Sequence, residues 1–146
     1  MEIIRIEHGS RLYAEWVELR TRILREPLGL RYSSDDLEAE RDQDHRVAQL
    51  GGTLVGGFIV CSIPDGSWKI RQVAVCESQQ GRGIGKALMQ FAVLQARAEG
   101  VGEISLHARE SVIPFYEQLG FHVVGDPFEE VGIPHSRMIL VPSRTE

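Results

Sequence analysis

The sequence predicts a mixed α/β (α+β) fold in which a sheet is flanked by helices. The first half is rich in apolar segments of strand length separated by tight turns, whereas the second half alternates strand-like and helix-like segments. No internal repeat, low-complexity tract or linker divides the chain. We therefore expect a single domain that spans residues 1–146, a common size for one hydrophobic core.

A strand and a helix are expected at the start of the chain. Residues 2–6 have the composition of a strand, and apolar residues then recur every three to four positions. This spacing predicts an amphipathic helix that begins near Ser10, a suitable N-cap. Pro27 disfavours helical geometry in the residue before it, so we expect the helix to stop around Glu26 and a loop to cover residues 27–34.

Three strands are expected next, at residues 46–50, 53–61 and 68–75, with turns that contain glycine or proline between them. In an antiparallel return of the third strand, paired residues have numbers that sum to about 131. Cys61 and Cys76 are then on the order of 20 Å apart, which is too far for a disulfide.

The second half carries the strongest helix signal, an apolar stripe from Ile84 that ends at Gly100. Gly120 likewise follows a shorter helical segment and is expected to end it. The remaining elements are a helix at residues 112–119 and strands at residues 104–107, 121–124 and 138–141.

Composition argues against several classes of function. The formal net charge is −5 and no basic run is present, so we expect no nucleic-acid partner. No apolar run reaches the ~18 residues that span a bilayer and no secretory signal precedes the domain, so we expect no membrane partner and a cytoplasmic location. The cysteines and histidines lack metal-ligand spacing, and no metal is predicted. The acidic segment 35–44 is either a solvated surface or a region that attracts a cationic amine.

The most distinctive segment is Gln80-Gly81-Arg82-Gly83-Ile84-Gly85, which joins a strand to a helix. A helix start has unpaired N–H groups and a positive dipole end, and glycines let a phosphate approach the main chain. Lys86 is followed by alanine rather than serine or threonine, which argues against a nucleoside triphosphatase loop. The glycine spacing also differs from that of dinucleotide-binding loops. The segment therefore predicts a pyrophosphate site of another class.

This loop resembles the Gln/Arg-x-x-Gly-x-Gly/Ala motif of the GCN5-related N-acetyltransferase (GNAT) superfamily at every fixed position. Residues 112–121, with an aromatic pair ahead of Gly-Phe, resemble the second signature of that family. Residues 128–138 resemble the tail of its ElaA/YjcF-like branch. The resemblance implies a mostly antiparallel sheet of six to seven strands with a splayed central strand pair, acetyl-CoA as co-substrate and, by analogy, a homodimer.

The resemblance also implies how acetyl-CoA is held. The backbone of the strand before the loop would hydrogen-bond the pantetheine arm and the acetyl carbonyl, and the loop amides would hold the pyrophosphate. Arg109 stands where the family frequently carries asparagine, and a phosphate contact is expected for it instead. The implied coenzyme-binding residues are Val73, Val75, Gln80, Gly81, Arg82, Gly83, Ile84, Gly85, Lys86 and Arg109.

Tyr116 stands where the family often has a tyrosine that protonates the departing CoA thiolate, so it is the expected general acid. Its alternative is a packed aromatic residue. The attacking amine must lose a proton, and the candidate bases are Glu77, Glu130 and His135, each near an expected strand end or loop. His135 follows Pro134 in an expected loop, where a surface role is its alternative. The predicted catalytic residues are thus Tyr116, His135 and Glu77.

The sequence therefore predicts an acetyl-CoA-dependent N-acetyltransferase, an acyltransferase that acetylates a primary amine of a small molecule or peptide by direct attack in a ternary complex. The alternative function is a non-catalytic acyl-CoA sensor or interaction module with the same fold. The regions that form acceptor pockets in this family carry no motif, so the amine is left open.

Overall fold

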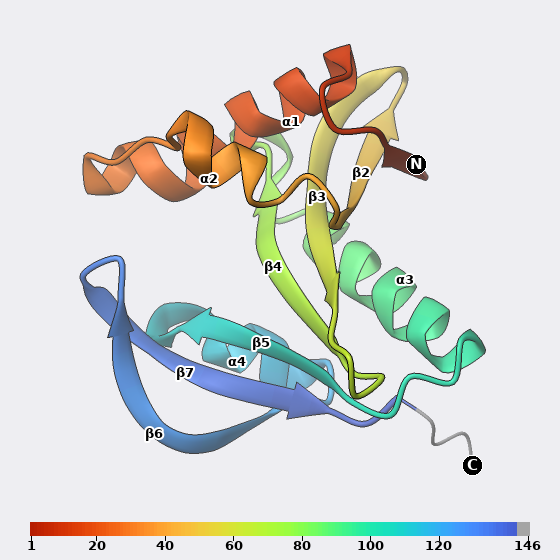
Figure 1. Ribbon diagram of the computed structural model, residues 1–146, viewed down its shortest axis with the longest axis vertical. Helices are drawn as coiled ribbons and strands as arrows, with labels where there is room; N and C mark the ends of the chain where they lie inside the picture. Colours follow the sequence, from red (N-terminus) through yellow and green to blue (C-terminus); the bar gives the residue numbers. More distant parts are fainter. Residues whose placement is uncertain (143–146) are drawn as a thin grey trace. The chain divides into compact units, whose positions relative to one another are not determined.

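The computed structural model describes residues 1–142 and contains a seven-stranded sheet of order β1-β2-β3-β4-β5-β7-β6 (Figure 1). The β4–β5 pair is parallel, whereas β1–β2, β2–β3, β5–β7 and β6–β7 are antiparallel. This confirms the predicted mixed, mostly antiparallel sheet with flanking helices. No helix in these residues is long and apolar enough to cross a membrane.

The chain forms two compact units. The first unit contains residues 1–61 and 72–88, and the second contains residues 62–71 and those from 89 onward. Strand β4 (Trp68–Val75) and helix α3 (Ile84–Ala98) each contribute residues to both units.

The first unit begins with β1 (Glu2–Ile6) and α1 (Arg11–Arg20), as predicted. The Ser10 side chain accepts a hydrogen bond from the Tyr13 amide at 3.1 Å and caps the helix. Helical structure then continues past the predicted stop, because Pro27 lies in the first turn of a short helix, where its missing N–H is not needed. The extension consists of the π-helical η1 (Thr21–Arg25) and the 3₁₀ segment η2 (Glu26–Leu28).

The acidic segment begins as a short helix, α2 (Ser34–Glu38), where the sequence predicted the end of a loop. The Ser33 side chain accepts from the Asp36 amide, and the Asp36 carboxylate accepts from the Ser33 amide, which forms a capping box. The hydrogen bonds from Ser33 hold the pKa of Asp36 below its usual value.

Strands β2 (Asp44–Leu50) and β3 (Thr53–Ser62) form the predicted hairpin, and they pack against α1. The indole ring of Trp16, which is fully buried, lies over the backbone of Gly57. Cys61 and Cys76, both half-buried, are not joined by a disulfide bond in the described part of the chain.

Replacing Gly57 with alanine is expected to destabilise the protein strongly. An added Cβ would lie 2.5 Å from the Arg46 carbonyl oxygen and 2.9 Å from the Trp16 ring. Overpacking of this kind typically costs about 1–3 kcal/mol, which for a chain of this size lowers the thermal midpoint by roughly 3 to 10 °C. Thermal unfolding monitored by circular dichroism measures the shift. Gly102→Ala is the control, because a Cβ there meets nothing within 4 Å, and equal midpoints for the two variants would contradict the prediction.

In the second unit, β5 (Ile104–Arg109) is followed by the 3₁₀ turn η4 (Glu110–Val112) and by α4 (Ile113–Gln118), which packs against β5. The parallel β4–β5 pairing in this unit covers only Trp68–Ile70 and Ile104–Leu106, so His107 lies beyond it. A short pairing of this kind is what a splayed central strand pair requires.

The last two strands are longer than the sequence predicted. Strand β6 (His122–Glu130) continues through Gly125 and Pro127, and β7 (Ile133–Leu140) begins five residues earlier than expected. An edge strand with a bulge tolerates both residue types, and the β6–β7 register shifts between Val124 and Phe128. His135 therefore lies in β7 and not in a loop, with only 4% of its surface exposed.

Candidate active site

Strand β4 contains one residue more than the stretch of β3 that faces it. The Ile63 amide donates to the Ser67 carbonyl at 2.9 Å, and the Cys76 amide donates to the Val55 carbonyl at 2.7 Å. From Val55 to Ile63 there are eight residue steps, whereas from Ser67 to Cys76 there are nine. The extra residue indicates a β-bulge, and Gln72, with a left-handed φ of 60° inside the strand, accounts for it. This conformation costs a residue with a side chain about 1–2 kcal/mol.

Gln80, the first residue of the glycine motif, braces the loop against β4. Its side-chain Nε2 donates to the Val75 carbonyl at 3.1 Å, and its amide donates to the Glu77 carbonyl at 3.5 Å after the 3₁₀ turn η3 (Glu77–Gln79). Both the side-chain amide and the backbone N–H of Gln80 are thus bonded within the protein, so Gln80 holds the loop against the end of β4.

The glycine loop leads directly into the first turn of α3. Gly81 and Gly83 have φ values of 80° and 81°, and a Cβ at either position would meet nothing within 4 Å. The Gly83 carbonyl accepts the Ala87 amide at 3.0 Å and starts the helical hydrogen bonding. The first-turn amides have no acceptor within the helix, and together with the helix dipole they favour an anion. These amides belong to Ile84, Gly85 and Lys86.

Charged side chains surround this loop. Arg82 and Lys86 are both exposed, so they place positive charge beside the first turn of α3. Glu77 is engaged by Arg22, whose Nε and Nη2 donate to its carboxylate at 3.2 and 3.3 Å. These hydrogen bonds hold the pKa of Glu77 below its usual value. A carboxylate held in this way is a weak base, so the ion pair suits a role in holding the loop rather than in proton transfer.

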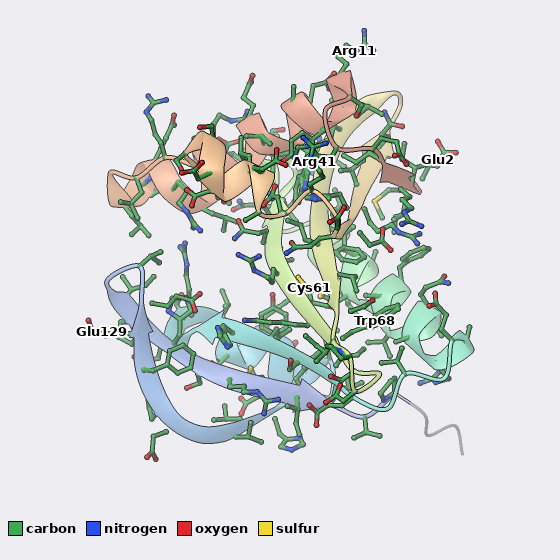
Figure 2. All side chains as sticks on the ribbon, viewed as in Figure 1. Glu2, Arg11, Arg41, Cys61, Trp68 and Glu129 are labelled. Carbon is green, nitrogen blue, oxygen red and sulfur yellow. The ribbon has the colours of Figure 1, made fainter. Side chains whose placement is uncertain are left out.

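A second group of side chains, the His107 cluster, lies in the second unit near the end of β6, where Glu129 is labelled in Figure 2. It consists of His107, Phe128, Glu130 and His135. The Nδ1 atom of His107 lies 2.8 Å from one carboxylate oxygen of Glu130, and Nε2 of His135 lies 3.9 Å from the other. The Phe128 ring packs edge-on against His107 and stacks on His135, with centroids 4.9 and 6.1 Å apart.

Strand register places these residues on one face. Across the β5–β7 ladder, His107 is paired with Arg137 and Arg109 with His135, and across β6–β7 Phe128 is paired with His135. Residues two apart in a strand share a face, so these side chains project from the same side of the sheet. Arg109 is thus placed beside His135 in the register, at the last position of β5.

Glu130 orients His107. Burial would raise the pKa of Glu130, but the hydrogen bond with His107 and the electrostatic interactions with His107, His135 and Lys69 lower it below its usual value. The ionised carboxylate accepts the Nδ1 proton of His107, which leaves Nε2 of that ring as the basic nitrogen. The Nδ1 atom of His135 lies 2.9 Å from the Ile133 carbonyl, and its side chain is 5% exposed against 27% for His107. His107 is therefore the more accessible base.

Tyr116 lies in α4 and is 7% exposed. Its ring packs edge-on against Phe115 and Phe121, with centroids 5.0 and 5.7 Å away. Burial raises the pKa of its phenol above the usual value, so the hydroxyl stays protonated through the physiological pH range. The residue is both a packed aromatic and a retained proton donor.

A profile of the acetyltransferase (GNAT) domain matches residues 31–142. The chain belongs to the GNAT acetyltransferase family. This match covers the bulged strand, the glycine loop, α3 and the His107 cluster, so each lies inside the GNAT domain.

Curated relatives of this GNAT domain match it over part of their length. Serotonin N-acetyltransferase 2, chloroplastic, of Oryza sativa subsp. japonica is 38% identical over 65 residues, which are 44% of this chain and 32% of the relative. Glucosamine 6-phosphate N-acetyltransferase of Trypanosoma brucei brucei is 40% identical over 52 residues, 36% of this chain and 35% of the relative. The chain thus spans about a third of the length of these two relatives.

Solved structures share the fold over nearly the whole chain. Escherichia coli ElaA superposes with a TM-score of 0.78 at 24% identity, covering 95% of this chain and 98% of the other. An aminoglycoside 6′-N-acetyltransferase complexed with coenzyme A superposes with a TM-score of 0.79 at 16% identity, covering 100% of this chain and 99% of the other. Both similarities concern the GNAT fold.

Within the GNAT domain, tertiary structure adds residues that sequence reasoning missed. Residues 80–86 of the glycine motif lie directly before α3 and in its first turn, as the motif indicated. No sequence signal singled out His107, yet it bonds Glu130 from 23 residues away. Gln72 and its left-handed φ were also missed, because a glutamine carries no signal for that conformation.

Proposed function

We propose that this GNAT acetyltransferase transfers the acetyl group of acetyl-CoA to a primary amine of a small molecule or peptide within a ternary complex. The glycine loop is the observation that supports this proposal, because it follows the bulged strand β4 and leads into the first turn of α3, whose amides have no acceptor within the helix. The open space at Gly81 and Gly83 and the exposed cations Arg82 and Lys86 fit a pyrophosphate.

In this proposal the backbone of Val73 and Val75 binds the pantetheine arm and the acetyl carbonyl. An N–H that bonds the thioester oxygen becomes more effective as charge develops on it, which stabilises the tetrahedral intermediate. The neutral amine nitrogen forms a bond to the carbonyl carbon, the carbon–sulfur bond then breaks, and the nitrogen releases one proton to solvent as the amide forms. Tyr116 donates its phenolic proton to the departing thiolate and regains a proton from solvent.

We propose that His107 rather than Glu77 or His135 takes the proton of the amine. An alkyl ammonium with a pKa of ~10.4 is neutral in about one molecule per thousand near pH 7.4, a free-energy cost of about 4 kcal/mol. The Glu130 carboxylate orients the His107 ring and stabilises its cation once the proton has moved. The Arg22 ion pair at Glu77 and the low exposure of His135 support this choice.

Excess acetyl-CoA is expected to raise the thermal unfolding midpoint. A ligand at ~100 times its dissociation constant adds about 2.7 kcal/mol of stability, which corresponds to roughly 5 to 10 °C for this chain length. Differential scanning fluorimetry with acetyl-CoA, NAD and ATP in parallel measures the effect. NAD and ATP should leave the midpoint unchanged, and the absence of a shift at millimolar acetyl-CoA would remove the basis of the proposal.

Release of CoA in the presence of an amine panel then separates an enzyme from an acyl-CoA sensor. Turnover above the rate of acetyl-CoA hydrolysis with any amine supports transfer. Binding without turnover across polyamines, amino sugars, lysine derivatives and peptide amino termini would favour the sensor.

A further inference from the structure

Gln72 has a backbone conformation that other contacts must support. Among residues 1–142, Val131 is the other non-glycine residue with positive φ, and it lies in the turn between β6 and β7 rather than inside a strand. A left-handed residue with a side chain persists within a strand only where its surroundings hold it. The contacts of Gln72 therefore determine the shape of β4 immediately before Val73 and Val75.

The Gln72 side chain is held by Tyr32, which lies between η2 and α2. The Tyr32 hydroxyl donates a hydrogen bond to Oε1 of Gln72, across 40 residues of sequence. The guanidinium carbon of Arg20 lies over the Tyr32 ring at 4.8 Å from its centroid, and that of Arg25 lies over it at 4.7 Å. Two cation–π contacts thus fix the ring and the direction of its hydroxyl.

Arg20 anchors this arrangement in the core of the first unit. It is fully buried, and its Nη2 donates to Oε1 of Glu40 at 2.7 Å, an oxygen that also accepts the Tyr13 hydroxyl at 2.7 Å. Its guanidinium carbon lies 5.2 Å from the Trp16 ring. Among the described residues, Nε and Nη1 of Arg20 have no hydrogen-bond partner, so aromatic stacking and the Glu40 bond hold the group. Tyr32 is therefore supported by a rigid neighbour.

We propose that Tyr32 is a positioning residue for the acyl half of acetyl-CoA. By holding Gln72 in its left-handed conformation, the Tyr32 hydroxyl keeps the backbone groups of Val73 and Val75 directed toward the pantetheine arm and the acetyl carbonyl. This role rests on the proposed function and deepens it. In this proposal two parts of the first unit bind different parts of acetyl-CoA. The loop that begins at Gln80 binds the pyrophosphate, whereas binding of the pantetheine arm and acetyl group depends on Tyr32.

Tyr32→Phe tests the proposal because it keeps the aromatic ring and its contacts with Arg20 and Arg25 and removes only the hydroxyl. Isothermal titration calorimetry is performed with acetyl-CoA and with 3′-phospho-ADP, which has the pyrophosphate but no pantetheine arm. We expect the dissociation constant of acetyl-CoA to rise roughly two- to tenfold, the range for one neutral hydrogen bond, and that of 3′-phospho-ADP to stay unchanged. An unchanged acetyl-CoA constant, or equal losses for both ligands, would overturn the role of Tyr32.

Substitutions at Gln72 provide a second, independent readout. Gln72→Ala keeps a Cβ at the left-handed position and removes the acceptor, so it should weaken acetyl-CoA binding at least as much as Tyr32→Phe. Gln72→Gly adopts the same φ without strain, so it should bind acetyl-CoA nearly as the parent does, and adding Tyr32→Phe to it should have no further effect. Equal weakening by alanine and glycine would contradict the proposal. Failure of the unmodified protein to bind acetyl-CoA would instead reject the proposed function itself.

Discussion

Replacing Gly83 with valine is expected to weaken acetyl-CoA binding by at least about 100-fold, which would remove the stabilisation of roughly 5 to 10 °C that the ligand gives. Gly83 has a φ of 81° and its carbonyl begins the hydrogen bonding of α3. A β-branched residue is a severe outlier at this φ, so the loop must take another path. The first-turn amides would then no longer point together at a pyrophosphate. Ligand-dependent fluorimetry and calorimetry measure the loss.

Gly66→Val is a matched control for this change. Gly66 has a φ of 91°, and a Cβ there also meets nothing within 4 Å, but it lies in the turn between β3 and β4. The control should lower the midpoint of the ligand-free protein to a similar degree and keep the full shift with acetyl-CoA. If Gly83→Val retained that shift, the glycine loop would not be the pyrophosphate site.

Replacing His107 with glutamine is expected to lower kcat about 10²- to 10⁴-fold with an amine acceptor, the usual contribution of a general base. Glutamine can still donate a hydrogen bond to Glu130 but cannot take the proton of the amine. Because the variant must rely on amine that is already neutral, its rate should rise about tenfold per pH unit up to the acceptor pKa of ~10.4. The deficit relative to the parent should therefore shrink as pH rises, which steady-state kinetics between pH 6.5 and 9.5 would show.

His122→Gln is the control for His107→Gln, because His122 is an exposed histidine on β6, which is separated from β5 by β7. It should leave kcat and its pH dependence unchanged, and both variants should keep the acetyl-CoA shift in the thermal midpoint. A His107 variant with the kcat of the parent would exclude this residue as the base and return Glu130 and His135 to consideration.

Local signals account for the parts of the fold that the sequence predicted well. These signals are apolar periodicity, the Ser10 cap and the turn glycines, and each depends on contacts within a few residues. For this reason β1, α1, the β2–β3 hairpin and α3 were located correctly. The same reliance on local signals gave strands that were too short, because β6 contains Gly125 and Pro127 and β7 contains Pro134, residue types that are uncommon inside strands. An edge strand with a bulge accommodates them, and only the sheet shows which strand is the edge.

In the candidate site, too, some features follow from local sequence and others depend on tertiary packing. The sequence by itself determined a glycine-rich turn that leads into a helix start, and this pattern predicts an anion site because first-turn amides have no acceptor within the helix. Only the tertiary structure decided which histidine carries a carboxylate partner and how Gln72 is held. Both depend on strand register and on packing between residues 23 and 40 positions apart, and a slip of one residue in a strand would turn each side chain to the opposite face.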